Sequence, residues 1–271
     1  MLKFDRRYIF LMAFICVALP IMFPLNSPVT VTPEVQSVFD DIEKLPTGSP
    51  LLLAIDYEPS DSPEVDPMTI AILQHCFRKN LRVIVCSTWP TNGTGAGIAE
   101  RWVKKVAGEM HKVKGKDYVN LGFKTGTYAV VIGMGEDLRK TFPTDYNGAE
   151  ISTMEVMNGI KTLKDFPFMV CIHDDASVFT WITYGYERYG IKIGTGATAV
   201  MAVGNYAAMN AKQITGIIGG LKGASEYEKL MGFRGWASNG MDSQSVMHMY
   251  IIFLLILGNI MFFFFEKKKT K

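Results

Sequence analysis

Short apolar runs alternate with amphipathic segments through the middle of the chain. Patterns with helical spacing cover residues 63–80, 96–112 and 177–190, and apolar runs of strand length cover residues 51–56, 81–88, 117–123, 168–173 and 191–196. Continuous apolar strands that alternate with helices are typical of a mostly parallel sheet covered on both faces. The pattern predicts an α/β fold, Rossmann-like or flavodoxin-like, with helices on both faces of the sheet.

Two longer apolar runs stand near the ends of the chain, at residues 8–25 and 249–265. Each is about long enough to cross a bilayer. Basic residues flank their outer sides, namely Lys3, Arg6, Arg7 and the lysines of the last six residues. Because positive residues beside a span stay in the cytoplasm, we expect an integral protein of the cell membrane with both termini cytoplasmic and the main domain extracytoplasmic. A cleaved signal peptide is the alternative for the first run, although "FPLNSPVT" lacks a small-residue cleavage site.

These features divide the chain into six segments. The predicted organisation is a transmembrane anchor at 1–26, a linker with a short helix at 27–50, the extracytoplasmic domain at 51–235, a second linker at 236–248, a transmembrane helix at 249–265 and a basic tail at 266–271. Within the domain, the stretch 124–167 has poor periodicity. A helix interrupted by glycines is favoured for "TYAVVIGMGEDLRKTF", with a strand followed by a helix as the alternative.

Charge and cysteine content exclude some classes of protein. The formal net charge is +2, and apart from the C-terminal cluster the basic residues are scattered, so we expect no nucleic-acid partner. Four cysteines are present, of which Cys16 lies in the first apolar run, and Cys76, Cys86 and Cys171 show no C-x-x-C spacing. We expect no zinc site and three small buried side chains in the domain. A single disulfide between Cys76 and Cys86 stays open in an oxidising compartment.

The segment 213–232, "QITGIIGGLKGASEYEKLMG", is rich in glycine. If it is helical, its glycines form a smooth stripe at three- and four-residue steps; they are Gly216, Gly219, Gly220 and Gly223. Each glycine costs a helix about 1 kcal/mol relative to alanine, so the stripe requires a close contact, either with the sheet or with another subunit. Gly258 and Asn259 in the last apolar run are further interface candidates, because a polar side chain in a span usually finds a partner.

Several stretches carry a resemblance to a known family. With "IDYEPSD", "DYVNLGF", "QITGIIGGLKGASEYE" and a last span containing "LILGN", the chain resembles an uncharacterised family of prokaryotic membrane-anchored α/β proteins. The resemblance covers most of the domain and the last span. It implies the fold and the membrane attachment, and it implies no activity.

Polar residues follow several of the predicted strands, where a parallel sheet binds its ligands. The candidate catalytic residues are Asp56, Glu58, Ser87, Asp174 and Asp175. Carboxylates from two strands are suited to hold Mg²⁺ for phosphoryl transfer, and the order of acidic, hydroxyl and paired acidic strand ends loosely resembles haloacid dehalogenase-like phosphatases. That family has D-x-D after its first strand, whereas this chain has Asp56-Tyr57-Glu58. Asp174, Asp175 and Ser177 are also expected to cap the helix that begins near Val178, and capping is the favoured role for the two aspartates.

The loop "STWPTNGTGAG" at 87–97 offers backbone N–H groups at the start of a helix, which suits an anion. Its candidate ligand-binding residues, with one from the fifth strand, are Thr88, Asn92, Gly93, Gly95 and Thr195. The loop matches neither G-x-x-x-x-G-K-[ST] nor G-x-G-x-x-G.

We therefore expect a non-enzymatic, membrane-anchored subunit that binds a partner or a ligand in an assembly of membrane proteins, as a homo- or hetero-oligomer in the lipid bilayer. The alternative is an extracytoplasmic phosphatase or hydrolase. We expect no resident metal and no cofactor; Mg²⁺ belongs to the alternative alone.

Overall fold

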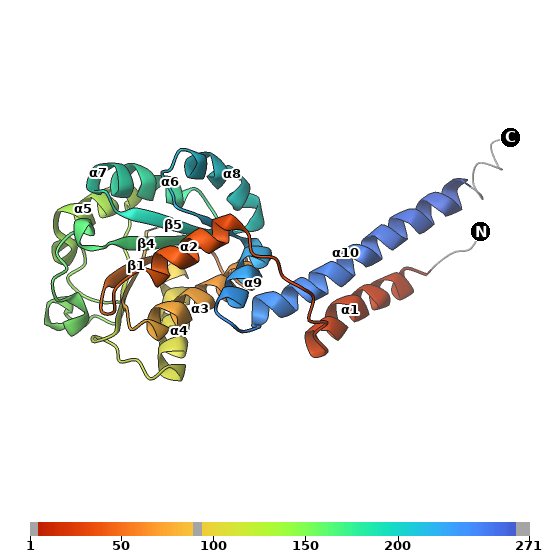
Figure 1. Cartoon of the computed structure of the whole chain (residues 1–271), viewed down its shortest axis with the longest axis horizontal. Helices are drawn as coiled ribbons and strands as arrows, with labels where there is room; N and C mark the ends of the chain where they lie inside the picture. Colours follow the sequence, from red (N-terminus) through yellow and green to blue (C-terminus); the bar gives the residue numbers. More distant parts are fainter. Residues whose placement is uncertain (1–4, 89–93, 264–271) are drawn as a thin grey trace.

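The computed structural model describes residues 5–88 and 94–263 and centres on one sheet (Figure 1). Its strands are β1 (Pro50–Asp56), β2 (Arg82–Ser87), β3 (Tyr118–Phe123), β4 (Phe168–His173), β5 (Lys192–Ala197) and β6 (Ile217–Gly219). They lie in the order β3-β2-β1-β4-β5-β6, and each pairing between them is parallel. The predicted α/β fold with a mostly parallel sheet is confirmed. Strand β6 is an addition to it.

Helices cover both faces of the sheet. One face carries α2 (Pro33–Glu43), α3 (Ser62–Arg78), α4 (Thr94–Glu109) and α9 (Gly220–Leu230). The other carries α5 (Thr127–Thr141), α6 (Ser177–Trp181), a π-helical turn (Ile182–Tyr186), α7 (Glu187–Tyr189) and α8 (Ala199–Asn210). Alternate residues of β1 enter the two cores, with Leu51 and Leu53 on the first face and Leu52 and Ala54 on the second. This explains why the strand is a continuous apolar run.

Most of the predicted elements agree with the structure. The short helix of the first linker is α2, and the helix favoured within 124–167 is α5. Its break lies at Asp137, where φ is −155°, and not at a glycine. Three short 3₁₀ turns (Ile151–Thr153, Glu155–Met157 and Leu163–Asp165) lead from α5 to β4. Cys76, Cys86 and Cys171 are buried and form no disulfide.

The prediction of one helix over 213–232 is wrong. Residues Ile217–Gly219 form β6 beside Thr195–Ala197 of β5, and α9 begins at Gly220. Gly220 has a φ of +57°, which turns the chain from strand to helix. The two isoleucines gain more from pairing at the sheet edge and from burial than from a glycine-rich helix, whose propensity is low.

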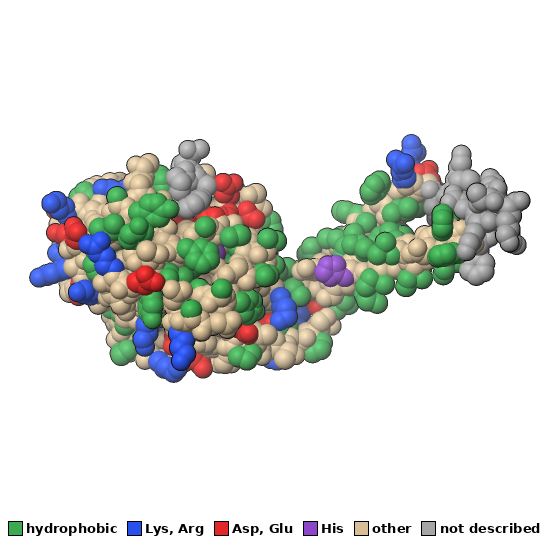
Figure 2. Space-filling view, turned by 90° about the horizontal axis from the view of Figure 1, so that it is seen from above, with side chains coloured by type: hydrophobic (Ala, Val, Ile, Leu, Met, Phe, Trp, Pro, Cys, Tyr) green, Lys and Arg blue, Asp and Glu red, His purple; other side chains and the backbone are tan. Residues whose placement is uncertain are grey.

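A pair of helices extends from the domain. Helix α1 (Arg6–Met22) lies beside α10 (Trp236–Met261), and the start of α1 and the end of α10 both lie away from the sheet (Figure 1). Residues 236–248, expected as a linker, are the first half of α10. Large apolar side chains are exposed along both helices, such as Phe10 (71% exposed) and Leu255 (62% exposed) (Figure 2).

Among the described residues, α10 is long and apolar enough to cross a membrane, judged by length and composition. Two spans were expected, and α1 does not count as the second by this measure, because it has 17 residues. At 1.5 Å per residue its length is about 26 Å, slightly less than the roughly 30 Å of a bilayer core.

The two helices are antiparallel and offset. Tyr250 Oη donates to Ile9 O at 3.0 Å, and Ser243 Oγ donates to Val17 O at 3.1 Å. From the first contact to the second, the chain moves back seven residues in α10 and forward eight residues in α1, so the helices run in opposite directions. On this register the charged start of α1, near Arg6, lies beside the apolar second half of α10 and not beyond its end.

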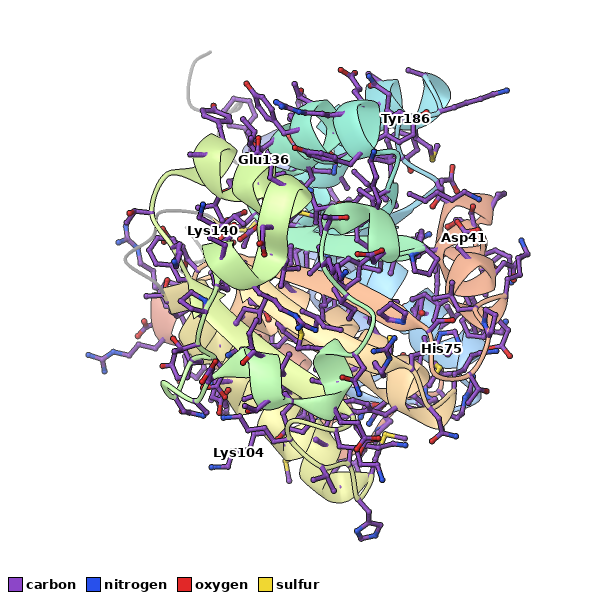
Figure 3. All side chains as sticks on the ribbon, turned by 90° about the vertical axis from the view of Figure 1, so that its left-hand side faces the viewer. Asp41, His75, Lys104, Glu136, Lys140 and Tyr186 are labelled. Atoms are coloured by element: carbon purple, nitrogen blue, oxygen red, sulfur yellow. The ribbon has the colours of Figure 1, made fainter. Side chains whose placement is uncertain are left out.

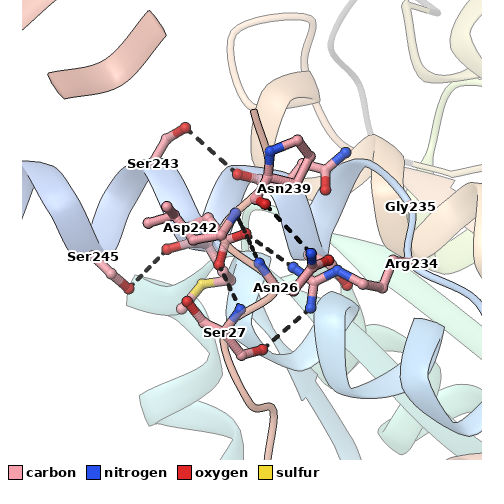
Figure 4. A network of polar contacts seen from close by, with 12 residues as sticks. Asn26, Ser27, Arg234, Gly235, Asn239, Asp242, Ser243 and Ser245 are labelled. Carbon is pink, nitrogen blue, oxygen red and sulfur yellow. Dashed lines mark hydrogen bonds and ion pairs between the residues drawn. The ribbon is translucent and has the colours of Figure 1, made fainter. Parts of the chain in front are cut away.

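Buried carboxylates attach the helix pair to the domain, and Figure 4 shows the network around one of them, Asp242. Asp242 accepts hydrogen bonds from the backbone N–H groups of Leu25, Asn26 and Ser27 at 3.0–3.3 Å, and it pairs with Arg234 at 3.0 Å. Glu228 of α9 accepts from the N–H groups of residues 235, 237 and 238, each at 2.9 Å. The acid thereby caps the start of α10.

Candidate functional site

The strand order places a reversal between β1 and β4. From β1 the chain continues outward through β2 and β3, and from β4 it continues in the other direction through β5 and β6. In open parallel sheets, ligands bind outside the carboxyl ends of the strands at this position. Asp56 ends β1 and His173 ends β4, and the two are paired in register. The polar residues at these strand ends are called the rim below; they are Asp56, Glu58, Ser87, Thr88, Asp174 and Asp175.

Asp56 is buried and bonded to the neighbouring strand end. Its Oδ1 accepts from Thr88 N at 2.7 Å and from Ser87 Oγ at 3.3 Å, and its Oδ2 accepts from Thr88 Oγ1 at 3.1 Å. The structure thus brings Asp56, Ser87 and Thr88 together as the sequence predicted. These bonds hold the ends of β1 and β2 together.

Glu58 and Asp174 meet at the exposed side of the rim. Asp174 Oδ2 accepts from the backbone N–H of Glu58 at 2.6 Å, whereas the side chain of Glu58 is exposed. Asp174 therefore braces the loop after β1 and does not cap α6. Its pKa is raised to about 6, mainly by burial and also by the nearby charge of Asp61.

Asp175 lies just before α6 and accepts a hydrogen bond from its first residue. Its Oδ1 accepts from the N–H of Ser177, the first residue of α6, at 2.7 Å. Its Oδ2 is buried and has no hydrogen-bond partner among the described residues. Burial raises the pKa of Asp175 to about 7, and the charge of Asp56 adds to this shift.

His173 lies beneath the rim and is fully buried. Its Nδ1 is 2.7 Å from the carbonyl oxygen of Asp175, so Nδ1 carries the proton and donates it. Its Nε2 then accepts from Asn205 Nδ2 of α8 at 3.0 Å. Burial lowers the pKa of His173 to about 4. Both ring nitrogens are bonded within the chain, which leaves no nitrogen to accept a proton from a ligand.

Among the residues predicted to bind a ligand, two of those that the structure describes, Thr195 and Gly95, have roles in packing. Thr195 is buried within β5, where its Oγ1 donates to Cys171 O at 3.0 Å. At Gly95 a Cβ would lie 2.5 Å from Ile55 O, so this glycine allows α4 to approach the sheet closely. Asn92 and Gly93 lie outside the described residues.

The loop after β1 disfavours an anion. Glu58, Asp61 and Glu64 stand at or just before the first turn of α3, where a Rossmann-type protein binds phosphate. Glu64 Oε1 accepts from Ala199 N, at the start of α8, at 2.7 Å. Within 5–88 and 94–263, no group of three or more His, Cys, Asp or Glu side chains is arranged to hold a metal ion.

The rim is therefore a compact acidic surface above the buried His173, whose ring nitrogens are both hydrogen-bonded. Asp174 and Asp175 can hold or release a proton near neutral pH, and a ligand with hydrogen-bond donors or a positive charge suits them. Sequence reasoning missed Asp61 and Asn205. The amphipathic pattern of a helix does not indicate which strand end an inward-facing amide will reach, so it gave no signal for Asn205.

The glycines predicted as an interface contact elements of the same chain. A Cβ would lie 2.3 Å from Glu34 O at Gly216, 3.1 Å from Ala202 Cβ at Gly219, 2.5 Å from Glu64 Oε1 at Gly220 and 2.9 Å from Ile218 C at Gly223. Packing within the domain thus accounts for all four, and a role between subunits stays a prediction.

In α10 the two interface candidates differ. Asn259 Nδ2 donates to Leu255 O at 2.8 Å, so its amide donor has a partner within the helix. At Gly258 a Cβ would meet no atom within 4 Å.

Comparisons with protein-family models, with curated proteins and with solved structures gave no match. The family resemblance stays a prediction, and any functional conclusion rests on the geometry of this chain.

Proposed function

We propose that this chain is a membrane-anchored, extracytoplasmic α/β module that acts as a binding subunit of a membrane assembly. The observation that carries the proposal is the apolar surface of the α1–α10 pair, whose large side chains are exposed along both helices. Large exposed apolar patches mark contacts with a membrane or with another protein. In the proposal α10 crosses the bilayer and α1 is a second, shorter anchor, with Arg6 and Arg7 extending toward the lipid headgroups.

A groove between the two helices suits a further transmembrane helix. It has a volume of about 400 Å³ and is lined by apolar residues of both helices, among them Met12, Phe253 and Leu257, with Gly258 at its wall. A glycine in such a wall allows close approach of another helix backbone. The proposed occupant is a transmembrane helix of a partner subunit, which is either another membrane protein or a second copy.

The rim supports a binding role over catalysis. Asp56 and His173 are held by hydrogen bonds within the chain, and the two acids nearest the surface, Asp174 and Asp175, also accept hydrogen bonds from its backbone. Such groups give a rigid acidic surface for a partner or a small ligand.

The test is the native mass of the full-length protein after gentle extraction from its own membrane. We expect a mass above that of one chain, and we expect Gly258→Leu, which fills the groove, to reduce it to the single chain. Ile256→Phe adds volume at an exposed position of α10 that does not line the groove, so this control should keep the larger mass. A wild-type protein that is extracted as a bare monomer would contradict the proposal.

An extracytoplasmic Mg²⁺-dependent phosphatase is the second candidate. The raised pKa values of Asp174 and Asp175 favour it, since a protonated carboxyl near neutral pH suits a general acid. It requires Mg²⁺-dependent phosphoester turnover that is lost in Asp56→Asn and in Asp175→Asn. If the wild type has no such turnover, the hydrogen-bonded roles described above are sufficient.

A further inference from the structure

Helix α8 has an exposed face without charge. Its twelve residues, AVMAVGNYAAMN, include no Asp, Glu, Lys or Arg. Ala202, Asn205 and Ala208 face the core, whereas the opposite side is open to solvent. The residues of this opposite side, called the α8 face below, are Ala199, Val200, Val203, Gly204, Tyr206 and Ala207.

The exposure of the α8 face is unusual for apolar residues. Val200 is 82% exposed and Val203 is 72% exposed, which are the two largest values among the exposed large apolar side chains of the described chain. Charged residues occupy other parts of the domain surface. Figure 3, which views the end opposite the helix pair, shows Lys104, Lys140 and Glu136 there.

The position of α8 relates it to the helix pair. It begins directly after the carboxyl end of β5, and its first residue, Ala199, lies against Gly220 at the start of α9. Two residues further along α9, Lys222 lines a cavity of about 390 Å³ together with Met241 and Asp242 of α10. Figure 1 shows α8 on the side of the domain from which α1 and α10 extend.

We infer that the α8 face rests on the headgroup region of the bilayer that α10 crosses, as a second membrane contact of the domain. The inference rests on the proposed membrane anchoring. An uncharged helix face with valines and a tyrosine has the chemistry of an interfacial contact, since apolar side chains enter the boundary layer and a tyrosine hydroxyl stays among the headgroups. The tether formed by Asp242 keeps the domain beside the membrane, so this contact requires no additional association.

The contact orients the rim. Asn205 on the inner side of α8 bonds His173, and Glu64 bonds the first N–H of α8, so the helix is fixed to the ends of β4 and α3. With the α8 face on the bilayer, the acidic rim is held next to the headgroups, which favours ligands and partners that lie at the membrane surface.

The experiment places one fluorescent label at a time on the full-length chain in vesicles of phosphatidylcholine and phosphatidylglycerol. The background is Cys16→Ala, because the other three cysteines are buried. The label is attached at Val203→Cys for the α8 face. The matched control is Val113→Cys, which is 58% exposed and precedes β3 at the opposite, amino-terminal edge of the sheet. A third label, at Ile256→Cys, reports whether α10 is inserted.

Quenching by lipids with brominated acyl chains is compared with quenching by aqueous iodide. We expect the label at 203 to be quenched by the brominated lipids and to be several-fold less sensitive to iodide than the label at 113. If the label at 256 is quenched by lipid while the label at 203 behaves like that at 113, the α8 contact is refuted and the anchoring stands. If the label at 203 is shielded from both quenchers, protein covers the α8 face and the inference is also refuted. If the label at 256 is reached by iodide, the anchoring itself fails.

Discussion

At the scale of the residue, the rim shows how burial changes the behaviour of a carboxyl group. Asp175 has one oxygen bonded to Ser177 and one buried oxygen without a partner, and burial raises its pKa to about 7. Within the described part of the chain, Asp56 accepts hydrogen bonds from the backbone N–H of Thr88 and from the hydroxyl groups of Ser87 and Thr88. Side chains of the same type therefore have different roles, which follow from the donors that the fold provides.

The raised pKa of Asp175 predicts a pH dependence of stability. Between an ordinary value of 3.8 and the folded value of about 7, the folded chain holds a proton that the unfolded chain releases. The free energy of unfolding contributed by this group is therefore fully present below the ordinary pKa and falls as the pH rises through this window. We expect Asp175→Asn, which keeps the capping oxygen, to remove that fall. Denaturant unfolding at pH values between about 4 and 7 measures the free energy of unfolding. If this free energy falls with pH as steeply in the variant as in the wild type, the raised pKa of Asp175 is refuted.

At the scale of the element, helix α9 shows that close packing, not helix propensity, can account for a glycine within a helix. Gly223 lies in α9 where that helix contacts β6, and a Cβ there would be 2.9 Å from the backbone carbon of Ile218. Gly108 in α4 has no atom within 4 Å of the corresponding position. The two glycines are both helical, but only the first is required by a close approach.

These two sites provide a matched pair of substitutions. We expect Gly223→Ala to lower the free energy of unfolding by about 1–3 kcal/mol, because the methyl group meets backbone that cannot rotate away. Gly108→Ala should raise it by about 0.5–1 kcal/mol through helix propensity. Denaturant unfolding of the full-length chain in detergent measures both. Equal effects at the two sites would contradict the contact between α9 and β6.

At the scale of the whole molecule, hydrogen bonds fix the position of the α1–α10 pair relative to the α/β domain. Asp242 of α10 bonds both Arg234 and the residues that follow α1, beginning with Leu25. Glu228 caps α10 from within the domain. This arrangement makes the helices a continuation of the α/β core. In the proposed membrane anchoring, a domain attached in this way would have a defined orientation at the membrane, and the proposed contact of α8 depends on that orientation.

Removal of the Asp242 carboxylate should release residues 25–27, which follow α1. We expect Asp242→Ala to cost about 3 kcal/mol or more, because three backbone donors and the Arg234 guanidinium lose their shared partner. Hydrogen exchange at the amides of Leu25, Asn26 and Ser27 should accelerate. Ser245→Ala removes only an exposed hydroxyl that donates to Met241 O, and it should leave that exchange unchanged. Protection of the three amides in Asp242→Ala would contradict the role of the cluster.

Local periodicity in the sequence is sufficient to predict the type of most elements. The continuous apolar run of β1 and the helical spacing of α3 each require a single kind of element, and together with their repeats they led to the parallel α/β fold. Asp56, Ser87 and Thr88 were predicted to converge, because the carboxyl ends of parallel strands lie at one edge.

The contacts between those elements depend on the folded chain and have no local signal in the sequence. Strand β6 forms because β5 offers an edge for Ile217 and Ile218, a partner that is about twenty residues away in the chain and is not visible in a local window. The link from Asn205 to His173 and the offset between α1 and α10 likewise depend on the approach of distant segments. Periodicity specifies which side of an element is buried, whereas the partner of that side is set by packing between elements.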